Sequence, residues 1–94
     1  EDLIKAIFKC FNNKESIGEI INIGSGEPSN IKKVILFIKN KINLGNPVFG
    51  KIPLRSDEIL RLYPNISKAQ KILNWKPSTS FQKGIKILIR NYKN

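Results

Sequence analysis

Apolar residues recur at helical spacing near both ends of the chain and in its middle. From Leu3 to Phe11 they follow one face of a helix, and Asp2 is placed to cap that helix. Between residues 30 and 42 a second apolar stripe follows Ser29, which is a natural N-cap residue. Both patterns predict amphipathic helices. The apolar residues of the first stripe are Leu3, Ile4, Ile7, Phe8 and Phe11.

Two further helices are predicted in the last third of the chain. Capping boxes of the Ser/Thr-x-x-Gln type open them, one beginning at Ser67 and one at Thr79. The first of these helices is short, and Asn74 suits its end because asparagine tolerates the left-handed region. Trp75 follows and is expected to fill a hole in the core. The inward positions are Ala69, Ile72 and Leu73 in the first helix and Phe81, Ile85, Leu88, Ile89 and Tyr92 in the second.

Two β-branched runs between these helices predict short strands. They are Glu19–Ile23, which ends in the turn Gly24-Ser25-Gly26, and Pro47–Ile52, which ends at Pro53. Because a helix would connect the two strands, we expect them to be parallel with a right-handed crossover. The pattern therefore predicts an α/β fold, a small subdomain with short strands and about four helices. A third run, Ile59–Tyr63, is compatible with either a brief strand or an extended loop.

The predicted second strand would place Arg55 just beyond its carboxyl end, where open α/β sheets collect ligands. A guanidinium presents a planar fork of donors suited to a phosphate or a carboxylate. Glu58, three residues later, is an acceptor for the hydroxyl groups of a polyol such as ribose. The competing interpretation is a surface ion pair between Arg55 and Asp57 or Glu58, worth at most about 1 kcal/mol.

The turn Gly24-Ser25-Gly26 is a weaker candidate for a phosphate cradle. A dinucleotide-binding turn needs a third glycine, and position 29 holds serine. We therefore interpret this stretch as a plain turn and expect no cofactor-binding residue in the chain.

Composition adds a strong positive charge to this picture. Seventeen Lys and Arg against seven Asp and Glu give a formal charge of +10, which could attract nucleic acid. The lysines of the predicted helix over residues 30–42 are expected to form a solvated face, because no aromatic residues alternate with them to stack bases. Nucleic acid is therefore the less favoured partner. These lysines are Lys32, Lys33, Lys39 and Lys41.

The remaining composition limits the chemistry of the chain. It has one cysteine, Cys10, in an apolar helical pattern, and no histidine, so a Cys-His pair and the usual zinc sites are excluded within it. A lone cysteine also favours a reducing compartment, and no apolar run approaches the length needed to span a bilayer. We expect a cytoplasmic protein without membrane contact, in which Cys10 serves packing.

Three groups of residues together carry a family resemblance. They are Arg55-Ser56-Asp57-Glu58, Pro64-Asn65-Ile66-Ser67-Lys68-Ala69, and Leu73-Asn74-Trp75-Lys76-Pro77 with the following Ser-Thr-Ser-Phe. In this order and spacing they resemble the C-terminal part of the NAD-dependent epimerase/dehydratase family, the extended short-chain dehydrogenases that act on nucleotide-activated sugars. Ile21–Gly26 and Glu1–Ile7 also resemble parts of that family, so the similarity spans nearly all of residues 1–94.

The resemblance implies a substrate-binding portion, 1–94, of a nucleotide-sugar epimerase, dehydratase or reductase in carbohydrate biosynthesis. In the longer enzyme a Rossmann-type domain would bind NAD or NADP, and related enzymes often form homodimers. Arg55 matches the family arginine that binds the sugar-nucleotide pyrophosphate, and Glu58 matches an acidic position that commonly contacts ribose. Catalysis in that family uses a tyrosine and a lysine four residues apart. Neither Tyr63 nor Tyr92 has such a lysine, so we expect no catalytic residue and no activity from these 94 residues alone.

Two other classes of function stay open from the sequence. One is a small basic nucleic-acid-binding domain, and the other is a structural interaction module whose site residues bind nothing. If the chain is a second domain, its apolar faces meant for the Rossmann-type domain would be exposed when it stands alone.

Overall fold

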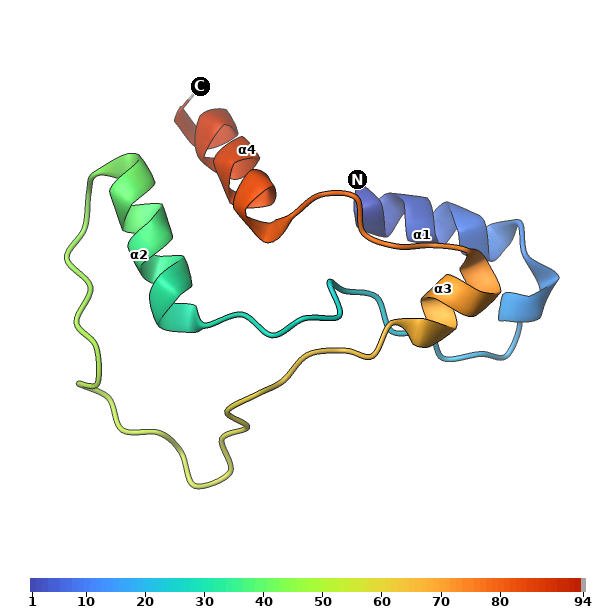
Figure 1. Ribbon diagram of the computed structural model, residues 1–94, viewed down its shortest axis with the longest axis horizontal. Coiled ribbons are helices and arrows are strands. Elements are labelled where there is room, and N and C mark those ends of the chain that lie inside the picture. The colour runs from blue at the N-terminus through green and yellow to red at the C-terminus, as the bar shows by residue number, and fades with distance from the viewer. Residues whose placement is uncertain (94) are drawn as a thin grey trace. The chain divides into compact units, whose positions relative to one another are not determined.

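The structure is a computed structural model that describes residues 1–93 of the chain. The ordered elements within this range are helices, coloured along the chain in Figure 1. They are α1 (Asp2–Phe11), the short 3-10 helix η1 (Lys14–Ser16), α2 (Ile31–Ile42), α3 (Ser67–Leu73) and α4 (Phe81–Lys93). The chain divides into two compact units, the first formed by Glu1–Glu27 with Tyr63–Ser80 and the second by Pro28–Leu62 with the residues from Phe81 onward.

The predicted α/β fold is wrong, because no residue from 1 to 93 belongs to a strand. The two expected strands, Glu19–Ile23 and Pro47–Ile52, are irregular and lie in different units. A strand needs a neighbour for its backbone N–H and C=O groups, and neither run pairs with one. The alternation in the first run instead reflects burial on one side, since Ile20 is exposed while Ile21 and Ile23 pack against the core. Alternation of buried and exposed residues is thus expected of any half-buried extended segment, whether or not it pairs with another strand.

The core of the first unit lies between α1 and α3. Ala6 and Ala69 are 1% and 0% exposed, and Leu73 and Trp75 are each 4% exposed. The two alanines have no side chain beyond Cβ, so the helix backbones can approach closely, and Trp75 fills space beside them. The predictions that Ala69, Leu73 and Trp75 face inward are confirmed. Cys10 packs against the same cluster, as expected of a structural cysteine.

The N-terminal end of α1 is hydrogen-bonded to the segment that follows α3. The Asp2 carboxylate accepts from the Ser78 hydroxyl at 2.6 Å and from the backbone N–H groups of Ser78 and Thr79 at 3.0 and 2.9 Å. The backbone oxygen of Asp2 accepts from Trp75 Nε1 at 2.9 Å. The three bonds to the carboxylate, led by that from the Ser78 hydroxyl, hold the pKa of Asp2 below its usual value. Asp2 therefore joins two distant segments rather than capping α1 with its side chain, as the sequence had suggested.

The predicted apolar stripe of α1 lies largely outside the core. Its five residues are between 44% and 80% exposed. The side of α1 that faces α3 carries the smaller residues Ala6 and Cys10 instead, because the close packing of the two helices leaves no room for long side chains. Within the described part of the chain, a large apolar helix face is thus left uncovered.

The predicted helices form close to the expected positions, although their caps differ. Asn30 rather than Ser29 caps α2, and its side-chain oxygen accepts from an N–H of the first turn at 3.2 Å. The capping box expected from Ser67 is absent, because Ser67 is the first residue of α3 and follows the N-cap Ile66; Asn65 Oδ1 instead accepts from the Ser67 N–H at 2.9 Å. Asn74 ends α3 with φ 49°, which confirms the left-handed conformation predicted for it.

The second unit contains α2, α4 and an irregular segment over residues 43–62. The undecided run Ile59–Tyr63 forms no strand: it bends at Leu60 and Arg61, and its last residue belongs to the first unit. α2 and α4 contact each other, and the half-buried residues of both helices are mainly apolar. No described residue of this unit is fully buried, and Leu88 and Tyr92 of the predicted α4 stripe are exposed. The unit therefore has a much thinner core than the first.

Candidate functional site

Arg55 and Glu58 lie on a turn in the irregular segment of the second unit. The backbone N–H of Glu58 donates to the carbonyl oxygen of Arg55 at 3.1 Å. Across the same turn, Arg55 Nε donates to Glu58 Oε2 at 3.3 Å, and the two side chains are 78% and 35% exposed. The structure thus brings the two predicted site residues together as the surface ion pair that was the competing interpretation of Arg55.

The expected position of Arg55 at the carboxyl end of a strand is wrong, because no strand precedes it. Its place is determined by the turn itself, with Ser56 and Asp57 as the central residues. An exposed pair of this kind contributes at most about 1 kcal/mol to stability. The contact therefore orients the guanidinium without holding it strongly.

The ion pair leaves part of each side chain unused. Within residues 1–93, the terminal guanidinium nitrogens of Arg55 and the Oε1 atom of Glu58 have no hydrogen-bond partner. A guanidinium held through Nε can still present its terminal N–H groups to a phosphate or a carboxylate in a bidentate manner. Glu58 Oε1 can accept a hydrogen bond from a hydroxyl group. The turn is chemically suited to an anion that carries neighbouring hydroxyl groups.

The glycines of the turn Gly24-Ser25-Gly26 serve close packing within the first unit. A Cβ atom at Gly24 would lie 2.5 Å from Pro64 Cγ, and one at Gly26 would lie 3.1 Å from Ile66 Cγ1. Gly26 also has φ +77°, a conformation that favours glycine. The space over the turn is therefore filled by the chain that precedes α3. Glycine at these two positions is therefore required by the packing of the turn.

Other side chains with catalytic potential are not gathered into a site. Tyr63 and Tyr92 are exposed and lie in different units. Over residues 1–93, no three His, Cys, Asp or Glu side chains come together where they could hold a metal ion. None of the helices in this range is long and apolar enough to cross a bilayer.

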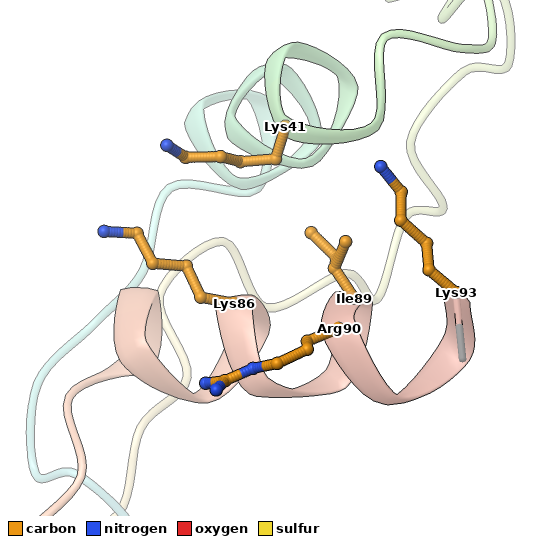
Figure 2. Close-up of a pocket in the computed structure, with 5 residues that line it drawn as sticks. All are labelled: Lys41, Lys86, Ile89, Arg90 and Lys93. Atoms are coloured by element: carbon orange, nitrogen blue, oxygen red, sulfur yellow. The ribbon is translucent and has the colours of Figure 1, made fainter.

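A pocket that the sequence analysis missed lies in the second unit. Its volume is about 320 Å³, and it is lined by Lys41 of α2 and by Lys86, Ile89, Arg90 and Lys93 of α4 (Figure 2). Lys41 had been assigned to a solvated face. The sequence did contain a feature that could have indicated this pocket. α2 and α4 each carry four Lys or Arg residues and no acidic residue. Neither Arg55 nor Glu58 lines this pocket.

Comparison with known proteins finds relatives along almost the entire chain. It is 34% identical over 94 residues to a protein of Methanocaldococcus jannaschii whose provisional name is UDP-glucose 4-epimerase, covering 99% of this chain and 29% of the relative. It is 32% identical over 92 residues to a dTDP-4-dehydro-6-deoxyglucose reductase of Escherichia coli, covering 98% of this chain and 28% of the relative. An uncharacterised UDP-glucose epimerase of Bacillus subtilis is 28% identical over 90 residues, covering 89% of this chain and 26% of the relative.

The chain thus spans less than a third of the length of these relatives. No family model matches it, and no solved structure matches it. The relatives agree in one respect, since their names place them among enzymes that epimerise or reduce nucleotide-activated sugars. The chain is therefore related in sequence to proteins named as nucleotide-sugar epimerases and reductases.

Proposed function

We propose that this chain is the nucleotide-sugar-binding part of a longer NAD(P)-dependent epimerase, dehydratase or reductase of the epimerase/dehydratase family. The observation that carries the proposal is similarity over 98–99% of the chain to two proteins named for reactions of UDP- and dTDP-sugars. Both relatives are more than three times as long as the matched region, so the reaction itself would depend on residues outside this chain. Such an enzyme would act in the cytoplasm.

In this proposal Arg55 binds the diphosphate of the nucleotide sugar and Glu58 binds ribose hydroxyl groups. The geometry of the turn supports both assignments, because the terminal nitrogens of Arg55 and Oε1 of Glu58 are unused within residues 1–93. The ion pair is compatible with binding, since a diphosphate can engage the terminal N–H groups while Nε stays on Glu58. The exposed pair is also weak enough to be displaced.

The cofactor of the longer enzyme would be held outside this chain. The Gly-Ser-Gly turn is packed against Pro64 and lacks the third glycine of a dinucleotide-binding turn. A Rossmann-type domain is the proposed holder of NAD or NADP, and the uncovered apolar face of α1 is a suitable surface for packing against it. The full-length enzyme is proposed to be a homodimer. The proposed role of the 94 residues of this chain is recognition of the substrate.

The experiment is isothermal titration calorimetry of the full-length protein with UDP-glucose, a dTDP-sugar, the corresponding nucleoside diphosphates and free glucose. We expect at least one nucleotide sugar to bind, its nucleoside diphosphate to bind more weakly, and free glucose to show no binding, because recognition runs through the diphosphate. Product analysis with NAD and NADPH then separates epimerisation from reduction. Failure of every nucleotide sugar to bind would leave a structural module and refute the proposal.

A further inference from the structure

The positive charge of the protein is concentrated in its second unit. That unit contains eleven Lys and Arg residues against two acids, a formal charge of +9, while the first unit has six against five, a charge of +1. The two acids are Asp57 and Glu58, which lie on the turn of Arg55 and outside both helices of the unit. The surface of α2 and α4 therefore carries cations with no carboxylate on the same elements to neutralise them.

Four of these cations line the pocket between α2 and α4. Figure 2 shows Ile89 pointing from α4 toward α2, with Lys86 and Lys93 on either side of it. The ammonium groups of Lys41 and Lys86 extend to the same side of the pair of helices. In Figure 2 the ammonium group of Lys93 extends to the opposite side from those of Lys41 and Lys86, and the guanidinium of Arg90 points away from α2. Within residues 1–93 none of the four cations forms an ion pair. The like charges of Lys41 and Lys86, which extend to the same side, repel each other, and a bound anion relieves that repulsion.

Stabilisation of helix ends accounts for only part of this arrangement. Lys41 lies in the last turn of α2, and Arg90 and Lys93 lie in the last turn of α4, where cations favourably meet the negative end of the helix dipole. Lys86 is near the middle of α4, where the dipole offers no such advantage. A role at helix ends also does not explain why the four side chains line one pocket with no carboxylate among them.

The size and lining of the pocket favour a small phosphate anion. Its volume of about 320 Å³ lies at the lower end for small-molecule sites. No aromatic side chain lines it, so nothing is placed to stack on a nucleobase. Primary amines and a guanidinium around an apolar floor suit the charged oxygens of a diphosphate.

We propose that the pocket lined by Lys41, Lys86, Arg90 and Lys93 binds a diphosphate group, either as free pyrophosphate or as part of a nucleoside diphosphate. This site is separate from the turn of Arg55 and does not depend on the proposed function. Binding would add an anion to a unit in which no described residue is fully buried, so it should also stabilise that unit.

The test is calorimetry of the full-length protein carrying Arg55→Ala and saturated with NAD, so that neither the turn nor the proposed dinucleotide site contributes, with inorganic pyrophosphate and ADP at about 0.15 M salt. In the same background, Lys86→Gln with Lys93→Gln is expected to weaken pyrophosphate binding by about 10-fold or more. The control pair, Lys33→Gln with Lys51→Gln, removes two lysines of the same unit outside the pocket and should change affinity less than about 2-fold. Equal affinities for pyrophosphate and ADP would indicate that the diphosphate alone is recognised, whereas tighter binding of ADP would identify a nucleoside diphosphate as the ligand.

NMR spectra of protein selectively labelled with ¹⁵N-isoleucine locate the binding site, because the amide signal of Ile89 should shift on addition of pyrophosphate. Three results would overturn the proposal. They are equal weakening by the two double variants, no saturable binding of pyrophosphate, and preferential binding of duplex DNA with a steep dependence on salt. The last result would establish a nucleic-acid surface instead. Loss of nucleotide-sugar binding by Arg55→Ala alone bears on the proposed function and leaves this site untouched.

Discussion

The substitution Arg55→Ala isolates the proposed role of the turn in substrate binding. The Arg55 side chain is 78% exposed, and within residues 1–93 it is held by the ion pair with Glu58, so its removal should change the free energy of unfolding by less than about 1 kcal/mol. A loss of affinity in the variant would therefore not result from unfolding. A substitution at Arg55 can therefore report on substrate binding without a large change in stability.

The expected magnitude follows from the unused terminal nitrogens of the guanidinium. Charge-assisted hydrogen bonds contribute roughly 1.5–3 kcal/mol, so Arg55→Ala in the full-length protein should weaken nucleotide-sugar binding by about 10–100-fold. Arg55→Lys keeps the charge but loses the planar fork, so its affinity should lie between those of the wild type and Arg55→Ala. Calorimetric titration with the nucleotide sugar that binds most tightly measures all three proteins.

Arg61→Ala is the matched control. Arg61 lies six residues later in the same irregular segment, is exposed and carries the same charge, but no role is assigned to it. If binding depends on the placement of Arg55, Arg61→Ala should leave affinity within about 2-fold of the wild type, since a distant surface charge is screened. Equal effects of the two substitutions would mean that only net charge matters. An unchanged affinity in Arg55→Ala would remove this residue from the site.

Three further predictions concern the first unit. Leu73→Ala should lower the free energy of unfolding by about 2–5 kcal/mol because it empties part of the core, whereas Leu60→Ala, at an exposed position, should have little effect in the same urea titration. The lowered pKa of Asp2 adds stability above its usual value of 3.8, and that stability is lost as the pH falls through the lower folded-state pKa. Asp2→Asn should remove this acid-side decrease from a plot of melting temperature against pH, and an unchanged plot would contradict the assignment. Gly24→Ala should destabilise the protein by about 1–3 kcal/mol in thermal unfolding, because its Cβ would clash with Pro64, and a neutral result would show that the turn has free space.

The uncovered face of α1 illustrates the limit of periodicity as a guide to packing. The pattern correctly predicted a helix from residues 2 to 11, because the repeat of apolar side chains is a local property. It could not show which side of the helix α3 would cover. The close approach of Ala6 and Ala69 decided that, and the large apolar residues were left facing outward.

The candidate site shows the same limit. Sequence alone placed Arg55 and Glu58 close enough to interact, and the turn confirms that they do. The sequence wrongly predicted a strand before them. A β-branched run favours extended backbone, but it does not show whether a partner strand is present. The pocket lined by Lys41 and three cations of α4 was also missed, since its lining combines residues more than forty positions apart.

The sequence by itself determined the helices, the left-handed end at Asn74, the burial of Trp75 and the relation to nucleotide-sugar enzymes. These features depend on local spacing, on single-residue conformational preferences or on the order of short motifs. Three features were determined only by the tertiary structure. They are the absence of paired strands over residues 1–93, the uncovered face of α1 and the assembly of the cationic pocket. Each of those depends on which segments meet in space, and backbone pairing, burial and charge clustering arise only from such meetings.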